Sequence, residues 1–226
     1  MKRMMNLSEE TDGKLYKRTD TVPVSCDGCG GKAFCCKATD DTIILDPYDM
    51  YELEKAQKGG FEAGYGKYYE LRVVDGITLP YLKKAGNTGD CTLLGQDGRC
   101  SIYANRPGFC RLFPLGRLYT PEGFSYILQT GQCPCNTPAG SEVTVESWLG
   151  IKDIEEYEKY VQQWHELTER SQREAISALT SENADDPEKA ALLRNISMKL
   201  LKTFYLAPYE TEMPFYPQFY TRFSLL

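Results

Sequence analysis

The chain has 226 residues, of which 42% are hydrophobic and 26% charged, a composition typical of a globular protein that buries a core. Its formal net charge of −6 excludes the basic footprint of a nucleic-acid-binding protein, and no basic run indicates an anionic membrane surface. The beginning of the chain lacks the apolar segment of a signal peptide, and no stretch reaches transmembrane length. We therefore expect a cytoplasmic protein with neither nucleic-acid nor membrane partners.

Nine cysteines and a single histidine set the available chemistry. In a reducing compartment, so many thiols indicate metal or redox chemistry rather than disulfides. The one histidine, His165, leaves almost no material for histidine-based catalysis, and no catalytic residue is assigned.

Composition divides the chain into three parts. Residues 1–20 are polar and charged, and we expect a loose arm or one short helix there. Residues 21–145 contain all nine cysteines and are expected to form the metal-binding domain. Residues 146–226 are expected to form helices and an aromatic tail that pack on the same body.

Four cysteines lie within the eleven residues 26–36. Cys26 and Cys29 have the C-x-x-C spacing that lets two thiolates bind one metal from a tight turn. Cys35 and Cys36 are adjacent, and neighbouring side chains are expected to point in different directions. We therefore expect one of them to complete the site begun by Cys26 and Cys29, and the other to face a second site or the far side of a cluster.

Turn and capping residues predict the elements of the first half. Asp46 followed by Pro47 is typical of a helix N-terminus. Asp75-Gly76 is typical of a hairpin turn. The expected elements are a buried strand over 42–45, a helix over 47–57, a hairpin over 69–83, a hairpin over 91–103, a helical turn from Pro107 and a hairpin over 115–130.

The predicted hairpin over 91–103 turns at Asp97-Gly98 and carries Cys91 and Cys100, one on each strand, so that both could face one centre. Tyr103, at its end, is expected to be a core aromatic.

The last third has a helical pattern. Apolar residues recur at three and four positions from Trp148 to Leu167, which predicts an amphipathic helix that continues or restarts to about Leu179. After a polar break over 181–186, a second helix is predicted with an apolar stripe that ends at Phe204. The aromatic tail is too apolar to be solvated and is expected to pack back onto the body.

The cysteine pattern resembles the YkgJ-type cysteine-cluster family, also called the putative zinc- or iron-chelating domain, which includes flagellin lysine N-methylases. The resemblance covers roughly residues 21–140 and depends on three motifs. These are Cys26-x2-Cys29-x5-Cys35-Cys36, then Cys91-x-Leu93-Leu94, then Asp97-Gly98-Arg99-Cys100-Ser101-Ile102-Tyr103-x2-Arg106-Pro107-x2-Cys110-Arg111-x-Phe113-Pro114.

The resemblance implies about eight metal-linked cysteines, whereas Cys135 stands where relatives usually have glycine. The implied ligands are Cys26, Cys29, Cys35, Cys36, Cys91, Cys100, Cys110 and Cys133.

Eight thiolates suffice for two tetrahedral four-sulfur sites, or for one iron–sulfur cluster and one zinc ion. All-sulfur ligation selects zinc or iron–sulfur over magnesium, calcium or manganese. Arg99, Arg106 and Arg111 lie among the later ligands and are candidates to donate hydrogen bonds to sulfur.

The sequence thus predicts an α+β protein. A small metal-organised cysteine-cluster domain with short β-hairpins and helical turns is followed by a C-terminal helical segment. Metal ions are the expected partners. The resemblance also implies an alternative, an iron–sulfur-dependent lysine methyltransferase that uses S-adenosylmethionine on a protein substrate.

Overall fold

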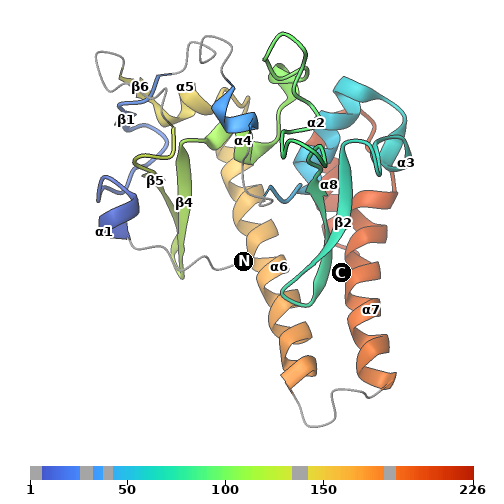
Figure 1. The fold of residues 1–226 in the computed structure, drawn as a ribbon. Coiled ribbons are helices and arrows are strands. Elements are labelled where there is room, and N and C mark those ends of the chain that lie inside the picture. Colours follow the sequence, from blue (N-terminus) through green and yellow to red (C-terminus); the bar gives the residue numbers. More distant parts are fainter. Residues whose placement is uncertain (1–6, 26–32, 38–42, 134–141, 181–186) are drawn as a thin grey trace. The chain divides into compact units, whose positions relative to one another are not determined.

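The computed structural model describes residues 7–25, 33–37, 43–133, 142–180 and 187–226 (Figure 1). Helices and short antiparallel strand pairs make up the chain, which confirms the predicted α+β class and its C-terminal helical segment. None of the helices in these ranges is both long enough and apolar enough to cross a membrane. The predicted boundaries at residues 20 and 145 stay predictions.

The chain divides into two compact units. Residues 2–40 and 85–162 form one unit, called here the cysteine unit, and residues 41–84 and 163–226 form the other, called the helical unit. The long helix α6 (Ile154–Thr180) passes from the first unit into the second.

The cysteine unit is built from short elements. Besides the first part of α6, these are α1 (Leu7–Glu10), β1 (Thr21–Val22), the 3₁₀ helices η2 (Phe34–Cys36) and η3 (Tyr103–Asn105), α4 (Gly108–Leu112), β4 (Leu115–Thr120), β5 (Gly123–Leu128), β6 (Val143–Thr144) and α5 (Val145–Leu149).

The predicted hairpin over 115–130 is present as β4 and β5, which pair from Leu115 opposite Leu128 to Thr120 opposite Gly123. The N-terminal segment extends this sheet, because the amides of Tyr16 and Tyr126 each donate a 2.8 Å hydrogen bond to the other residue's carbonyl. This pairing buries the Tyr16 side chain. The segment before residue 20 therefore contains the expected short helix, α1, and then packs on β5.

Polar contacts attach this sheet to the start of α6. Arg117 donates a 3.0 Å hydrogen bond to the Tyr157 hydroxyl, and the Tyr126 hydroxyl donates one of 2.9 Å to Glu158. Arg18 also donates to Glu158, at 3.3 Å. Buried polar groups need such partners, since an unmade hydrogen bond in the interior is costly. These contacts fix the framework on which the cysteine loops are placed.

The helical unit contains the remaining elements. They are α2 (Pro47–Gln57), α3 (Gly60–Gly64), β2 (Tyr69–Val74), β3 (Ile77–Leu82), the rest of α6, α7 (Pro187–Leu201), the π-helical turn η4 (Lys202–Leu206) and α8 (Phe215–Phe223).

Helix α2 has the predicted bounds and the predicted cap. The Asp46 carboxylate accepts a 2.9 Å hydrogen bond from the Asp49 amide, and the Asp49 carboxylate accepts one of 3.0 Å from the Asp46 amide. This reciprocal capping box satisfies two amides that the first turn leaves without helical partners. Pro47 occupies the first turn, where its missing N–H does no harm.

The predicted hairpin over 69–83 packs within this unit. Strands β2 and β3 are joined at Asp75-Gly76, and α7 lies beside them in Figure 1. The Thr78 amide donates a 3.1 Å hydrogen bond to the Ser197 hydroxyl of α7. On the outer edge of β3, Leu45 donates to the Pro80 carbonyl at 2.9 Å. Residues 43–45 thus pair with β3 through a single bridge rather than as a full strand.

The predicted helix over the apolar stripe from Trp148 to Leu167 is interrupted near its start. Helix α5 ends at Leu149, and Gly150 follows with a left-handed φ of 59°. Since glycine adopts this conformation without strain, it terminates the first helix although the apolar repeat continues across it. Helix α6 then begins at Ile154, and the predicted polar break over 181–186 lies outside the described residues.

The aromatic tail packs on α2 within the helical unit, and its predicted place on the same body as the cysteine-cluster domain stays a prediction. Phe215 and Phe219 of α8 are buried, and the Phe215 ring meets the Tyr51 ring of α2 at 5.5 Å between centroids. The Tyr51 hydroxyl donates a 2.9 Å hydrogen bond to the Met213 carbonyl. Aromatic burial and this buried hydrogen bond together hold the end of the chain on α2.

Candidate metal centre

The structure describes six of the eight predicted ligands, all in the cysteine unit. Cys26 and Cys29, together with their glycine-rich turn, lie outside the described residues, as does Cys135. No disulfide joins any of the six described cysteines. The described ligands are Cys35, Cys36, Cys91, Cys100, Cys110 and Cys133.

Cys35 and Cys36 lie in η2, and their sulfurs are 3.8 Å apart. The expectation that these side chains diverge was therefore wrong. Successive side chains point in opposite directions in a strand, but η2 is a helical turn entered through Ala33 at a left-handed φ of 46°. Two thiolates on one tetrahedral zinc ion are about 3.8 Å apart when each Zn–S bond is about 2.3 Å. The observed spacing thus fits two ligands of one centre.

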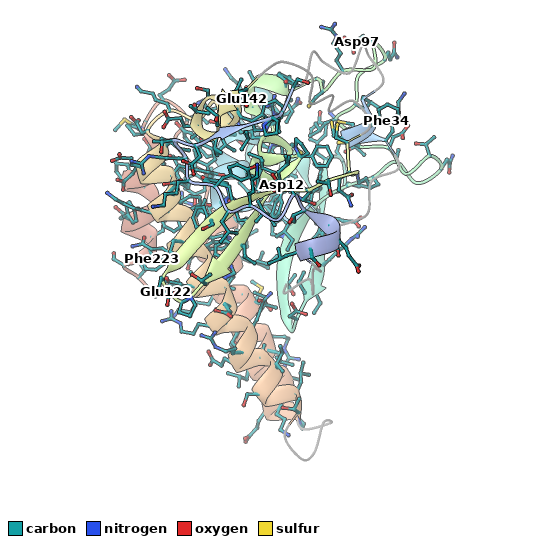
Figure 2. All side chains as sticks on the ribbon, turned by 90° about the vertical axis from the view of Figure 1, so that its left-hand side faces the viewer. Asp12, Phe34, Asp97, Glu122, Glu142 and Phe223 are labelled. Carbon is teal, nitrogen blue, oxygen red and sulfur yellow. The ribbon has the colours of Figure 1, made fainter. Side chains whose placement is uncertain are left out.

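A second loop brings Cys91 to the same place. The Cys91 amide donates a 2.7 Å hydrogen bond to the Cys36 carbonyl, which joins the two cysteine-containing segments through their backbones. Cys91 is buried, whereas Cys36 is partly exposed. Figure 2 shows sulfur atoms gathered next to the labelled Phe34, the first residue of η2.

Cys100 returns toward Cys91 through a tight loop. The Gly95 amide donates to the Arg99 carbonyl at 2.7 Å, and the Asp97 carboxylate accepts a 3.0 Å hydrogen bond from the Arg99 amide. Cys100 forms a β-bridge with Leu94. In this described stretch the predicted hairpin is thus a loop closed by one bridge, with no extended strands.

Electrostatic interactions act among four of the described thiols. The Cys36 pKa lies well above its usual value because Cys35 interacts with it, because it is partly buried, and because Cys91 and Cys100 add repulsion. Burial raises the Cys100 pKa, and the charges of Cys91 and Cys35 act in the same direction. Each of these thiols therefore opposes ionisation of the others. A bound cation would offset the repulsion between the resulting thiolates, as expected for metal ligands.

Two groups oppose that repulsion at Cys100. The Ile102 amide donates to its sulfur and the Arg106 guanidinium lies nearby, and both act to lower the Cys100 pKa. An amide and a guanidinium stabilise a thiolate rather than a thiol, so this side of the loop suits a deprotonated, metal-bound sulfur.

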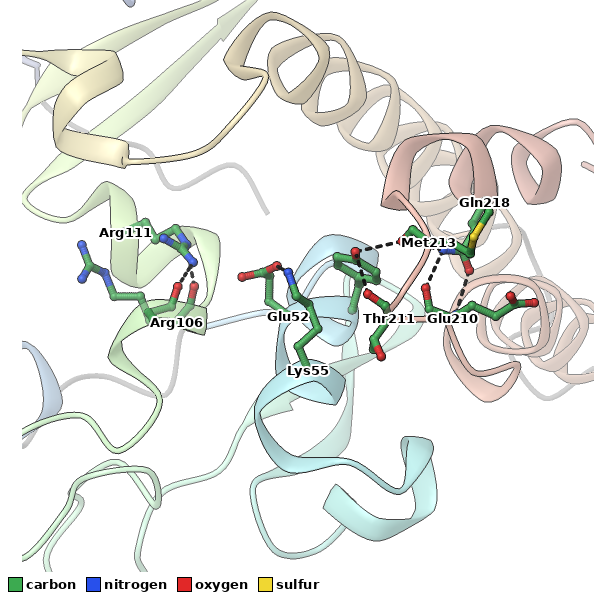
Figure 3. Close-up of polar contacts among 10 residues, drawn as sticks. Glu52, Lys55, Arg106, Arg111, Glu210, Thr211, Met213 and Gln218 are labelled. Atoms are coloured by element: carbon green, nitrogen blue, oxygen red, sulfur yellow. Dashed lines mark hydrogen bonds and ion pairs between the residues drawn. The ribbon is translucent and has the colours of Figure 1, made fainter.

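The turn that carries Arg106 is fixed by Arg111 of α4. The Arg111 side chain is buried, and its Nε donates a 3.0 Å hydrogen bond to the Arg106 carbonyl. A second nitrogen of the same guanidinium donates to the Ala104 carbonyl (Figure 3). Sequence spacing treats the two arginines alike, whereas in the fold Arg111 donates to backbone carbonyls of the turn and the charge of Arg106 acts on Cys100.

Arg106 stacks on Tyr103. The Arg106 guanidinium carbon lies 4.0 Å from the Tyr103 ring centroid, a cation–π contact. Tyr103 is 53% exposed, so its expected place in the core was wrong. One face of its ring instead supports the arginine, a role that the Tyr103-x2-Arg106 spacing alone does not reveal.

The structure also describes the last two predicted ligands of this set. Cys110 lies in α4 and Cys133 follows β5, each half-buried in the same unit. Within the described part of the chain, no three or more Cys, His, Asp or Glu side chains are already arranged to hold a metal ion. The full set of eight ligands therefore stays a prediction.

The helical unit contains a cavity of about 200 Å³ between α2 and α3. Its lining mixes aromatic, apolar and charged side chains, and no thiol is among them. The residues that line it are Met50, Leu53, Glu54, Gln57, Lys58, Gly60, Ala63, Gly64, Lys67, Tyr68 and Tyr69.

Comparison with known proteins agrees with the cysteine geometry. Residues 25–136 match the family model CxxCxxCC, described as a putative zinc- or iron-chelating domain. No curated protein and no solved structure matches the chain. The matched range covers every cysteine in the sequence and both loops that meet at Cys36 and Cys91.

Proposed function

Since residues 25–136 form a CxxCxxCC domain, a putative zinc- or iron-chelating domain, we propose that this chain binds zinc or an iron–sulfur cluster through cysteine thiolates. The observation that carries the proposal is the backbone hydrogen bond from Cys91 to Cys36, which joins two cysteine-containing segments more than fifty residues apart next to the 3.8 Å sulfur pair of Cys35 and Cys36.

The chemistry of these donors fits such a centre. Sulfur ligands select zinc and iron–sulfur clusters, whereas magnesium and calcium require oxygen. Cys35, Cys36, Cys91 and Cys100 would supply one four-sulfur set. Cys26, Cys29, Cys110 and Cys133 would supply the rest of the eight predicted ligands.

Metal binding would also stabilise the cysteine unit. Its elements are mostly short, and among the described residues the hydrogen bond from the Cys91 amide to the Cys36 carbonyl joins η2 to the 91–101 loop. Binding by a four-cysteine site is coupled to folding and contributes on the order of 10–16 kcal/mol of apparent free energy for a structural zinc. We therefore infer that the metal chiefly organises the fold.

The experiment is anaerobic purification followed by elemental analysis and a visible spectrum. A colourless protein with stoichiometric zinc, or a brown protein that dithionite bleaches, supports the proposal and identifies the metal. Folded protein that contains neither iron nor zinc would overturn it. The same preparation tests the methyltransferase alternative, because binding of S-adenosylmethionine in calorimetry would support that alternative and no binding at millimolar concentration would reject it.

A further inference from the structure

Arg106 has a donor without an acceptor. Its Nε is inaccessible to solvent and has no hydrogen-bond partner in the described part of the chain. A buried, charged donor without an acceptor is strongly unfavourable, so a native structure that keeps one indicates a partner at that point.

The geometry around Arg106 restrains this donor. The guanidinium stacks 4.0 Å over the Tyr103 ring, and the Arg106 carbonyl accepts the 3.0 Å hydrogen bond from Arg111. The hydrogen bond therefore restrains the backbone of Arg106, and the stacking restrains the plane of its guanidinium. Arg106 follows Cys100 by six residues, and its charge acts on the Cys100 thiol, so the guanidinium lies within electrostatic range of that cysteine.

The other two arginines of the motif are less suited to this role. Arg99 is exposed to solvent although it adjoins Cys100 in sequence. Arg111 is buried, but its Nε and a second nitrogen already donate to the carbonyls of Arg106 and Ala104. Arg106 alone among the three has a buried nitrogen without an acceptor in the described chain.

We propose that Arg106 is the positioning residue of the cysteine centre, and that its buried Nε–H donates a hydrogen bond to a metal-bound thiolate of the Cys35, Cys36, Cys91 and Cys100 group. The proposal rests on the function proposed above. Four thiolates around one divalent ion leave a net charge of about −2. A guanidinium at hydrogen-bond distance offsets part of that charge and orients the ligand sulfur.

The test compares Arg106→Gln with Arg99→Gln, because each variant removes one positive charge near Cys100 but only the first removes the buried donor. Loss of such an outer hydrogen bond lowers metal affinity by about 10- to 100-fold. In a chelator competition on anaerobically purified protein, we expect a decrease of that size for Arg106→Gln and an affinity close to wild type for Arg99→Gln. Equal affinities of the two variants would overturn the proposal.

A spectroscopic readout separates this role from a merely structural one. A hydrogen bond to a thiolate lowers the energy of the sulfur electrons, so its loss moves the sulfur-to-metal charge-transfer band of cobalt-substituted protein to longer wavelength. In an iron–sulfur protein, the same loss lowers the reduction potential. A weakened affinity with an unchanged band and an unchanged potential would overturn the proposal.

Two further variants keep the test decisive. Tyr103→Leu removes an exposed ring that supports the guanidinium, so it should fold and shift the band in the same direction by a smaller amount. Arg106→Lys keeps the charge but replaces the fixed Nε–H with a flexible ammonium donor, so restoration of full affinity by lysine would overturn the assignment of the positioning role to Nε. Absence of metal from the wild-type protein would instead reject the proposed function itself.

Discussion

The amide of Cys91 donates a 2.7 Å hydrogen bond to the carbonyl of Cys36. This bond joins two cysteine-containing loops that are separated by more than fifty residues, and it does so at the residues that carry the sulfurs. Backbone pairing therefore brings the thiols together, and a bound cation would then relieve their mutual repulsion. The predictions below follow from this arrangement.

Serine substitutions should divide the cysteines into two classes. Cys36→Ser and Cys100→Ser each remove a sulfur from the four-cysteine group, so we expect loss of most bound metal and of solubility together, because metal binding is coupled to folding. Cys135→Ser is the matched control and should be milder. The measurement is metal content per folded chain, and equal damage at Cys135 would contradict the ligand assignment.

Metal retention should depend on pH with a definite sign. The Cys36 pKa is raised by Cys35, by burial and by the other thiols, so binding must displace protons. Affinity should therefore fall as the pH falls, by about tenfold per pH unit for each thiol proton displaced. In the metal-free fold the sign is reversed, since a raised pKa stabilises the fold below about pH 8.5 and that contribution is lost as the pH rises.

This pH dependence is measured by the metal that survives chelator treatment at a series of pH values. Chelators themselves bind protons, so the chelator's own affinity must be corrected at each pH. Occupancy that is independent of pH after this correction would show that thiolates are not the ligands.

The capping box of α2 gives a test that is independent of the metal. Asp46→Ala removes the acceptor of the 2.9 Å hydrogen bond from the Asp49 amide. We expect a loss of about 1 kcal/mol in the free energy of unfolding, measured with urea. Asp46→Asn keeps a good capping side chain and should lose much less. Metal content should be unchanged in both variants.

The Gly76→Ala substitution tests the packing of the β2–β3 turn on α6. Gly76 has a φ of +86°, and an added Cβ would lie 2.7 Å from the Ala175 Cβ. Gly66 is the matched control, since its φ of +74° is similar but an added Cβ would meet nothing within 4 Å. Gly66→Ala should lose about 1–2 kcal/mol for the left-handed backbone alone, and Gly76→Ala should lose more. Equal losses in thermal or urea unfolding would show that the turn does not pack on α6.

Local signals in the sequence were sufficient for much of the fold. Asp46-Pro47 predicted α2 with its correct ends, and Asp75-Gly76 predicted the β2–β3 hairpin, because caps and tight turns depend on residues adjacent in sequence. The apolar repeat, by contrast, did not reveal the break at Gly150. Periodicity records which side chains are buried, whereas one left-handed glycine suffices to end a helix.

The site was predictable in composition but not in geometry. Spacing predicted that Cys91 and Cys100 could face one centre, which stays a prediction. It also suggested that Cys35 and Cys36 diverge, because it did not reveal the helical turn at η2. The different roles of Arg106 and Arg111 depend on contacts that sequence spacing does not specify.

X-ray absorption spectroscopy at the edge of the bound metal tests the central claim most directly, because it identifies the atoms that surround the metal. We predict a first shell of sulfur at about 2.3 Å in wild-type protein, with fewer sulfur neighbours in whatever metal Cys36→Ser or Cys100→Ser retains. A first shell of only nitrogen and oxygen at about 2.0–2.2 Å would contradict the account.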